Sequence, residues 1–378
     1  MGQSALKTNV WETRLCTGCG ACVGLCPYQG FWEGTTRPIF SCNLPDEEGR
    51  CSAFCPRLNL RLGDFYGPLG ATPEIGPVLD YALTRASDPR IRAREQHGGT
   101  LSALLVLALK EGFIDTALLA GRAKGLGLSP RLVKEPEEIE RYSGSAFFVS
   151  PTVSGYNEAR KSGFKRIGAV ATPCQAQAFA KIRSVSGRFE EKPGEDLALV
   201  LGVFCGWTLS LKSFRGRLKA LGFEDGVLMD TPAGKGTLEI KEGWGQRIEV
   251  PMEELGPFIN EACAVCLDTT SELADISVGS ARTREPWEEM RTWNQVIVRT
   301  EFGKSLFRLA VNSGILEVRQ PPDFALADLK VAARAKKRKA IQALRARGSL
   351  GGRLGYLDMK DPFLPDFFKA IEGQGDES

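Results

Sequence analysis

Apolar residues along this chain form blocks that indicate strands alternating with helices. Short apolar runs bounded by polar residues predict buried strands, and a longer apolar run and two segments that follow strands predict helices. Because strand–helix–strand units form parallel sheets, the pattern predicts an α/β (mixed α+β) core. The predicted strands are residues 116–120, 165–171 and 197–204, and the predicted helices are residues 101–112, 172–182 and 210–221.

Two cysteines lie where predicted strands end. Thr172 and Pro173 are typical first residues of a helix, so Cys174 is expected in the first helical turn, where amide donors and the helix dipole favour a thiolate. Cys205 directly follows the strand at 197–204. Because the carboxyl ends of parallel strands meet at the same edge of a sheet, one crevice can hold both thiols.

Composition narrows the possible chemistry. The 378 residues include 11 cysteines and one histidine, so a Ser-His-Asp or His-ligated zinc hydrolase could use only His97. Chemistry must therefore depend on sulfur or on a bound cofactor. The longest apolar run is about half the length that crosses a bilayer, and the N-terminus lacks an apolar signal core. We expect a cytoplasmic protein, not an integral membrane protein, whose clustered cysteines bind metal.

Four cysteines near the N-terminus are spaced by two, two and three residues and are followed by a proline. This spacing is typical of bacterial ferredoxins, in which the fourth cysteine of the run ligates a second cluster and another Cys-Pro lies downstream. Cys55-Pro56 is that downstream pair. The ligands predicted for a first [4Fe-4S] cluster are Cys16, Cys19, Cys22 and Cys55.

Cys26, the fourth cysteine of the run, would then join Cys42 and Cys51 in a second cluster. Long-loop ferredoxins have a further cysteine three positions before the one at 42, and Ile39 stands there instead. Three thiolates suit a three-iron cluster or a cubane with one non-cysteine ligand. One alternative is a single cluster on the four cysteines of the first run, without Cys42, Cys51 and Cys55. A zinc knuckle is another, although zinc sites usually pair two separate Cys-x-x-Cys elements.

Cys263 and Cys266 form a Cys-x-x-Cys pair that can complete a site with Cys174 and Cys205. Four thiolates suffice for a cubane cluster or for a structural zinc, and spacing alone does not choose between them. A ferredoxin-like module on the same chain favours the cluster, because electrons that arrive there need an acceptor.

Two loops are candidates for binding an anionic cofactor. Gly98 and Gly99 precede the helix from Thr100, so backbone amides can approach a phosphate at the helix N-terminus. Arg122 and Lys124 follow the first predicted strand and could meet a second anionic ligand. A glycine pair before a helix is also common in ordinary turns. No Gly-x-Gly-x-x-Gly follows a strand, so a Rossmann dinucleotide site is not indicated.

Basic residues concentrate near the C-terminus. Residues 330–347 hold eight Lys and Arg and no acid, so the remaining residues carry −5 while the whole chain carries +3. This segment predicts a helix that is solvated or docks a partner. It lacks interleaved aromatics and a strong apolar stripe, so we expect no nucleic-acid or membrane binding. The predicted domains are a ferredoxin-like iron–sulfur domain at 1–67, an oxidoreductase core at 68–327 and a basic helical C-terminal extension at 328–378.

Several motifs, in order between residues 94 and 318, together resemble one family. They are E-Q-H-G-G-T-L-S-A-L-L, E-E-I-E-R-Y-S-G-S-A-F-F, G-A-V-A-T-P-C-Q-A-Q-A, V-F-C-G-W, A-C-A-V-C-L-D-T-T-S-E-L-A-D-I-S-V-G and R-T-E-F-G-K-S-L-F-R-L-A-V-N-S-G-I-L-E. The chain resembles the beta subunits of coenzyme F420-reducing hydrogenases and dehydrogenases, which include formate dehydrogenase beta subunits. The joint match is specific, although no single motif is.

The resemblance implies an electron-transfer subunit of a larger redox complex, with FAD and a [4Fe-4S] cluster in its core. The flavin would exchange a hydride with coenzyme F420 and pass single electrons to clusters, so no side chain is expected to be catalytic. Asp275 and Gly279 match a motif with a positioning role. The implied core-cluster ligands are Cys174, Cys205, Cys263 and Cys266, and the candidate cofactor contacts are Gln96, His97, Gly98, Gly99, Thr100, Arg122, Lys124, Ser145 and Thr172.

Three positions depart from the family pattern. Ala146 follows a Gly-Ser pair where Lys or Arg is usual, Ser280 stands where an acidic residue is common, and Ile39 replaces a cysteine. The first two bear on the hydride partner, so NAD(P)H, ferredoxin or another carrier is the alternative to F420. Alternatives of a different class are an electron-transfer or assembly protein without flavin, and a zinc-stabilised binding module.

Overall fold

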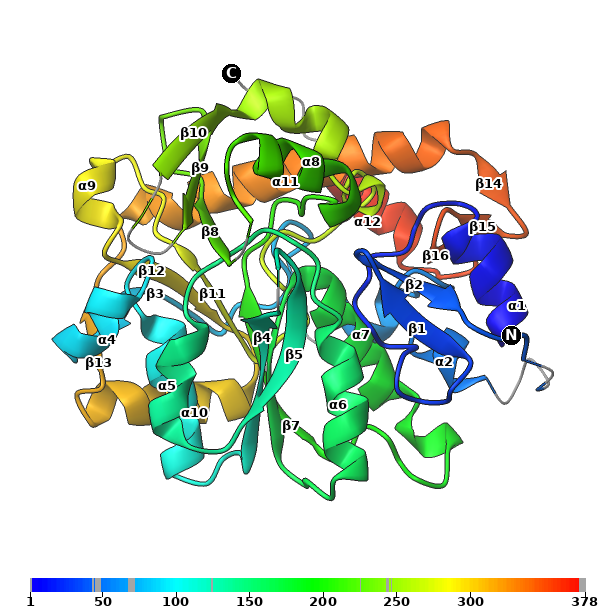
Figure 1. Cartoon of the computed structure of the whole chain (residues 1–378), viewed down its shortest axis with the longest axis horizontal. Helices are drawn as coiled ribbons and strands as arrows, with labels where there is room; N and C mark the ends of the chain where they lie inside the picture. Colours follow the sequence, from blue (N-terminus) through cyan, green and yellow to red (C-terminus); the bar gives the residue numbers. More distant parts are fainter. Residues whose placement is uncertain are drawn as a thin grey trace.

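An eight-stranded sheet with the strand order β13-β3-β12-β11-β7-β6-β4-β5 crosses the centre of the molecule (Figure 1). The structure is a computed structural model and describes residues 2–42, 44, 49–66, 72–123, 125–224, 226–242, 245 and 247–373. The strands of this sheet are β3 (Asp80–Ala86), β4 (Thr116–Arg122), β5 (Leu128–Val133), β6 (Ile167–Ala171), β7 (Leu197–Val203), β11 (Ile276–Ser280), β12 (Asn294–Val298) and β13 (Leu316–Arg319).

The middle of the sheet is parallel and its edges are antiparallel. β4, β6, β7 and β11 run in one direction, whereas β5 pairs antiparallel at one edge and β12, β3 and β13 extend the other edge antiparallel. The mixed α/β core, the three predicted strands and the parallel pairing of β6 with β7 are therefore confirmed.

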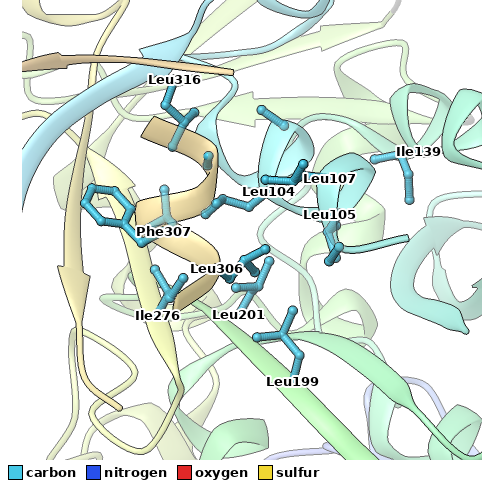
Figure 2. Close-up of a cluster of buried hydrophobic side chains, with 14 of the residues drawn as sticks. Leu104, Leu105, Leu107, Ile139, Leu199, Leu201, Ile276, Leu306, Phe307 and Leu316 are labelled. Atoms are coloured by element: carbon cyan, nitrogen blue, oxygen red, sulfur yellow. The ribbon is translucent and has the colours of Figure 1, made fainter. Parts of the chain in front are cut away.

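Helices cover both faces of the sheet. Leu199 and Leu201 face α5 (Thr100–Lys110) and α10 (Glu301–Asn312) in the apolar cluster of Figure 2. Val200 points the other way, because side chains alternate along a strand, and packs with α6 (Thr152–Lys161) and α7 (Pro173–Ser184). The helices predicted from residues 101 and 172 are thus α5 and α7, and the helix predicted near 210–221 is α8 (Leu211–Ala220).

Smaller elements surround this sheet. A three-stranded antiparallel sheet packs with α8 in a separate apolar cluster. Its strands are β8 (Val227–Asp230), β9 (Thr237–Glu242) and β10 (Arg247–Pro251). The other short elements of the core are α4 (Pro89–Arg94), η4 (Pro136–Tyr142), η5 (Ser186–Arg188), η6 (Met252–Phe258), η7 (Glu261–Cys263) and α9 (Trp287–Met290).

The two ends of the chain share one apolar core. Leu6 and Leu58 from the N-terminal segment pack with Ile341 and Phe367 from the C-terminal segment, and Figure 1 shows the two segments side by side. The N-terminal elements are α1 (Gln3–Leu6), the π-helical η1 (Lys7–Trp11), β1 (Gln29–Trp32), β2 (Thr35–Pro38), α2 (Arg50–Ala53) and α3 (Gly63–Tyr66). The C-terminal elements are α11 (Asp323–Ala346), β14 (Ser349–Leu350), β15 (Arg353–Leu354), β16 (Leu357–Asp358) and α12 (Leu364–Glu372).

The basic segment forms the helix that its composition predicted, as the second half of α11. This helix is partly buried, because Lys337, Ile341 and Leu344 are almost inaccessible to solvent. Part of its positive charge therefore points into the molecule, an arrangement that the sequence pattern did not indicate.

Candidate iron–sulfur and cofactor sites

Four N-terminal cysteines line one cavity, together with Thr36 and Arg57. The backbone N–H of Gly18 donates to Cys16 Sγ at 3.4 Å, and the Thr36 hydroxyl lies 3.4 Å from the same sulfur. Hydrogen bonds to cysteine sulfur are a common feature of iron–sulfur sites, where they tune the cluster. The four cysteines of this first set are Cys16, Cys19, Cys22 and Cys55, as the ferredoxin spacing predicted.

Burial disfavours ionisation of the thiols of the first set. It raises the pKa of Cys19 and Cys22 well above the usual thiol value, and it raises the pKa of Cys55 to about 11. Neighbouring thiolates raise these values further through like-charge repulsion. Four thiolates can share this cavity only if positive charge joins them, and iron ions of a cluster would supply that charge.

The backbone before these cysteines leaves no room for larger residues. Gly18 has φ +66°, and a Cβ built there would lie 2.2 Å from the carbonyl oxygen of Gly34. Gly20 has φ +85°, and its Cβ would lie 2.6 Å from the carbonyl oxygen of Pro151. The small residues of the motif thus let the N-terminal loop pack closely on the segment before α6.

The second set of four cysteines meets at the carboxyl edge of the parallel strands. Cys174 is the second residue of α7, which follows β6, and Cys205 lies just beyond β7. Cys263 ends η7, and the Cys266 amide donates to the Cys263 carbonyl at 3.1 Å. Burial raises the pKa of Cys174 and of Cys205, and the charges of neighbouring cysteines in this core set raise both further. The structure therefore brings together four cysteines from three segments that are far apart in sequence.

Hydrogen bonds also reach the sulfurs of the core set. The Thr208 amide donates to Cys263 Sγ at 3.4 Å, and the Thr172 hydroxyl lies 3.4 Å from Cys174 Sγ. Thr172 is the N-cap of α7, and its amide donates to Gln175 Oε1 at 2.9 Å. Thr172 thus lies beside a cluster-candidate cysteine, where the strand–helix pattern placed it.

The first set and the core set are neighbours. Burial is the main reason that the pKa of Cys19 is raised, and the charge of Cys174 is the largest contribution from another thiol. Electrostatic influence of this kind requires proximity, so Cys19 and Cys174 lie on adjoining sides of the two sites.

A third group contains Cys26, Cys42 and Cys51. Burial raises the pKa of Cys51, a hydrogen bond with the Gln29 side chain lowers it, and the charges of Cys26 and Cys42 raise it again. Ile39, which stands where long-loop ferredoxins have a cysteine, is 58% exposed. The structure thus groups the three predicted cysteines without a fourth cysteine among the described residues.

The thiols do not converge on a single point. Among the residues that the structure describes, no three His, Cys, Asp or Glu side chains are placed to hold one metal ion. In a zinc site all ligands bond one ion at about 2.3 Å, whereas in a cubane each cysteine bonds a different iron and the sulfurs stand farther apart.

Three cations next to the cysteines were not predicted. Lys181 Nζ donates to the Cys55 carbonyl at 2.8 Å, and Lys336 Nζ donates to the Cys205 carbonyl at 2.9 Å. Arg57 lines the cavity of the first set. The sequence could have indicated Arg57, because this residue directly follows the Cys55-Pro56 pair. It could not have indicated the two lysines, since they lie 126 and 131 residues from the cysteines they contact.

Two candidate cofactor contacts meet at strand β8. Gln96 Nε2 donates to the Met229 carbonyl at 2.6 Å, and the Ser145 amide donates to Gln96 Oε1 at 3.0 Å. The Met229 amide donates in turn to the Ser145 carbonyl at 2.7 Å. Gln96 therefore fastens the turn at Ser145 to β8, while the Ser145 side chain is exposed.

His97 extends this region next to the end of β8. His97 Nε2 lies 3.6 Å from Asp230 Oδ1, and the ring packs edge-on against Trp287. Within the described part of the chain, buried Nδ1 has no hydrogen-bond partner. Burial lowers the pKa of His97 although Asp230 opposes this, so the neutral imidazole is favoured. Asp230 and Trp287 were not predicted.

The glycine pair before α5 is packed closely against the protein itself. A Cβ at Gly98 would lie 2.8 Å from Asn294 Oδ1, and one at Gly99, where φ is +75°, would lie 3.0 Å from Ile91 Cγ2. The Thr100 amide donates to Asn294 Oδ1 at 3.2 Å. The small size of both glycines is thus needed for packing between β3, α4 and β12.

Arg122 and Lys124 are the remaining candidate cofactor contacts. Arg122 is the last residue of β4, with an exposed side chain, and so lies on the strand instead of in the following loop. Lys124 lies outside the described residues. Ala146 is buried in the cluster under β8, so this departure from the family pattern places a small apolar side chain in a core.

Asp275 and Gly279 contact residues in β7 and just after it. Asp275 Oδ2 accepts from the Val200 amide at 2.7 Å, and Oδ1 accepts from the Thr300 hydroxyl at 2.9 Å, which joins β7 to the start of α10. A Cβ at Gly279 would lie 2.2 Å from the Phe204 ring. These contacts agree with the positioning role expected of both residues.

Two sequence models of one family match the chain in succession. The model described as the N-terminal part of the coenzyme F420 hydrogenase/dehydrogenase beta subunit matches residues 81–155, and that of its C terminus matches residues 164–323. The coenzyme F420 hydrogenase subunit beta of Methanosarcina barkeri is 30% identical over 250 residues, which are 65% of this chain and 84% of that relative. The chain belongs to the family of coenzyme F420 hydrogenase/dehydrogenase beta subunits.

A solved structure supports the same fold, and another relative matches over a longer stretch. A chain of the F420-reducing [NiFe] hydrogenase complex from Methanosarcina barkeri superposes with a TM-score of 0.65 at 29% identity, over 73% of this chain and 94% of that chain. An F(420)H(2) dehydrogenase subunit of Methanosarcina mazei is 26% identical over 333 residues, which are 83% of this chain and 87% of that relative. The mixed α/β core is therefore shared with that chain of the hydrogenase complex.

The family models stop short of both ends of the chain. Residues 1–80 and 324–378 lie outside the matched segments, and they include the first cysteine set, Arg57 and nearly all of α11. Among the described residues, the longest helices are too polar and the apolar helices too short to cross a membrane.

Proposed function

We propose that this chain is the flavin- and iron–sulfur-containing beta subunit of a hydrogenase, formate dehydrogenase or heterodisulfide-reductase type of complex. When bound, FAD would exchange a hydride with coenzyme F420, and [4Fe-4S] clusters would carry single electrons to or from a partner subunit. The grouping of the 11 cysteines into three sets, two of them adjoining, is the observation that carries the proposal.

The protein's own task in this proposal is to hold and insulate the clusters. The first set would bind one cluster of an N-terminal ferredoxin-like domain, and the core set would bind another. Cys26, Cys42 and Cys51 would bind a second N-terminal cluster that needs a non-cysteine ligand or has three irons. Five of the 11 cysteines are buried and the other six are half-buried, which limits the access of water to the clusters.

The flavin would lie near the start of α5 and β8. His97 beside Asp230 and Trp287, the Gln96 side chain that ties the turn at Ser145 to β8, and the exposed hydroxyl of Ser145 are the groups that support this placement. Arg282, whose Nη2 donates to the Thr231 carbonyl at 2.7 Å beyond the end of β8, adds a positive charge nearby. Arg122 and Thr172 are farther candidates along the same carboxyl edge.

Coenzyme F420 is the proposed hydride partner because relatives across the matched length carry that coenzyme in their names. These include a hydrogenase subunit and an F(420)H(2) dehydrogenase subunit, and an F420-dependent formate dehydrogenase subunit beta from Methanocaldococcus jannaschii. The second candidate keeps the fold and uses NAD(P)H, ferredoxin or another carrier. Ala146 favours it, because a buried alanine replaces the usual cation beside Ser145.

An anoxic visible spectrum separates the candidates. The full chain, loaded with iron, sulfide and FAD, is recorded before and after addition of reduced F420, and in a parallel cuvette before and after NADH. Bleaching of flavin and cluster bands by reduced F420 alone supports the proposal. Bleaching by NADH alone supports the second candidate. A preparation that retains iron but binds no FAD would instead indicate an electron-transfer or assembly protein, and a colourless one a zinc module.

A further inference from the structure

Two cations from outside the family-matched segment flank the core cysteine set. Arg57 comes from the N-terminal segment and Lys336 from α11, whereas the four core cysteines lie within residues 164–323. Both ends of the chain therefore add positive charge to a site that the core itself provides.

Arg57 lies between the first set and the core set. Its side chain is 1% exposed and it lines the cavity of the first set. Gln177, which accepts a hydrogen bond from Arg57, lies three residues after Cys174 on α7, and Tyr356, on which Arg57 stacks, donates to the Val265 carbonyl beside Cys266. One buried cation thus lies beside both cysteine sites.

Among the residues that the structure describes, no carboxylate is paired with the guanidinium of Arg57. Its Cζ lies 4.3 Å from the centroid of the Tyr356 ring, and Nη1 donates to Gln177 Oε1 at 3.4 Å. Within the described residues, buried Nε has no hydrogen-bond partner. A buried N–H without an acceptor costs about 1–3 kcal/mol, and a cluster sulfide or thiolate beside Cys266 would satisfy it.

Lys336 approaches the core set from another element. Its Nζ donates to the Cys205 carbonyl at 2.9 Å and to the Asp268 carbonyl at 2.7 Å. The carboxylate of Asp268 accepts hydrogen bonds from the amides of Thr270 and Glu272 at 2.9 and 3.0 Å.

We propose that Arg57 and Lys336 are positioning residues that raise the reduction potential of the core centre, and that Arg57 couples this centre to the first N-terminal site. The inference rests on the core [4Fe-4S] centre of the proposed function. Reduction adds one negative charge to a cluster, and buried cations stabilise that charge more than they stabilise the oxidised form.

The test is a potentiometric titration of the full, iron-loaded chain followed by low-temperature EPR. The core signal is the one that Cys174→Ala removes, and the first-site signal is the one that Cys22→Ala removes. The charge variants are Arg57→Gln and Lys336→Gln, which keep hydrogen-bond donors but lose the charge, and Arg57→Lys, which keeps the charge. Arg61→Gln is the matched control, because Arg61 is close in sequence but half-exposed and paired with Asp64.

We expect Arg57→Gln and Lys336→Gln each to shift the core midpoint to a more negative potential. At the wild-type midpoint the ratio of reduced to oxidised core centre should fall about tenfold, which is about 59 mV for a one-electron couple. Arg57→Lys should restore most of the Arg57 shift, and Arg61→Gln should leave both signals unchanged.

Iron-loaded Arg57→Gln and Lys336→Gln proteins with the wild-type core midpoint would overturn the proposal. If Arg57→Gln loses iron, retention of iron and midpoint by Arg57→Lys supports a role for the charge. Loss of iron in both Arg57 variants, with no shift in Lys336→Gln, counts as refutation. A wild-type chain without any Cys174-dependent signal would refute the core centre itself, and this inference with it.

Discussion

The Arg57 guanidinium lies 4.3 Å from the centroid of the Tyr356 ring, so a cation from the N-terminal segment stacks on an aromatic residue from the C-terminal segment. Tyr356 is fully buried, and its hydroxyl donates to the Val265 carbonyl at 3.0 Å, one residue before Cys266. Together, the ring stack and the hydrogen bond of Tyr356 join both ends of the chain to the loop that carries the core Cys-x-x-Cys pair.

Removal of the Tyr356 hydroxyl should destabilise the fold, and removal of the whole side chain should destabilise it more. Tyr356→Phe keeps the ring under Arg57 and leaves the Val265 carbonyl unsatisfied, at a cost of about 1–3 kcal/mol. Tyr356→Ala also opens a cavity and should cost about 3–5 kcal/mol. Urea denaturation followed by tryptophan fluorescence measures both values. Equal losses in the two variants would mean that the ring stack contributes little.

Cysteine variants should remove iron from one site at a time. Cys174→Ala should remove about four irons per chain, the content of one cubane, and leave the N-terminal sites loaded. Cys22→Ala should do the reverse, and the two variants serve as controls for each other. Iron and acid-labile sulfide are measured after anoxic reconstitution. An iron content in Cys174→Ala equal to that of wild type would exclude the core assignment.

The buried Lys337–Glu272 pair should make stability depend on pH. The two charged groups are 2.8 Å apart and almost inaccessible to solvent. Burial raises the pKa of Glu272 from 4.5 to about 7 although Lys337 lowers it. The folded chain therefore keeps this proton between about pH 4.5 and 7 while the unfolded chain loses it, so the contribution of Glu272 to stability decreases as pH rises through that window.

Lys337→Met removes the cation that compensates the charged form of Glu272. At pH 8 the variant should lose about 3–5 kcal/mol, because a carboxylate is left buried without its partner. At pH 5 Glu272 is protonated in the folded chain, and the loss should be much smaller. Denaturant titrations at both pH values test this, with Lys339→Met on the exposed side of α11 as the control. A loss that is the same at both pH values would contradict the prediction.

Gly99→Ala should destabilise the protein whether or not flavin is bound. Its φ of +75° and the 3.0 Å approach of a Cβ to Ile91 disfavour any side chain, and the expected loss is about 1–3 kcal/mol. Gly216→Ala is the opposite case, since Gly216 lies inside α8 with nothing within 4 Å of its Cβ position, and it should gain about 0.5–1 kcal/mol. Thermal unfolding at matched iron loading compares them.

Gln96→Ala is the sharper test of the proposed flavin site. It removes the side chain that holds the Ser145 amide and the Met229 carbonyl, so the ratio of FAD to protein should fall while iron content stays unchanged. Arg90→Ala, on the exposed side of nearby α4, is the control. Full FAD occupancy in Gln96→Ala would place the flavin elsewhere.

Much of the fold and of the metal chemistry followed from local patterns. Apolar runs located β4, β6 and β7, and the rule for parallel strands brought Cys174 and Cys205 to one edge. The ferredoxin spacing grouped Cys55 with the first run, and the motifs identified the family. Each of these inferences depends on spacing over a few residues or on a general rule of sheet topology, and a sequence records both directly.

Other features were decided by tertiary structure alone. The positions of Arg57 and Lys336 beside the core cysteines, the burial of Lys337, and the shared core of the two chain ends all join segments that are far apart in sequence. A lysine in a basic helix looks the same in sequence whether it faces solvent or a buried carbonyl. Packing selects between these outcomes, because the apolar residues Ile341 and Leu344 turn one side of α11 inward and carry the neighbouring charges with them.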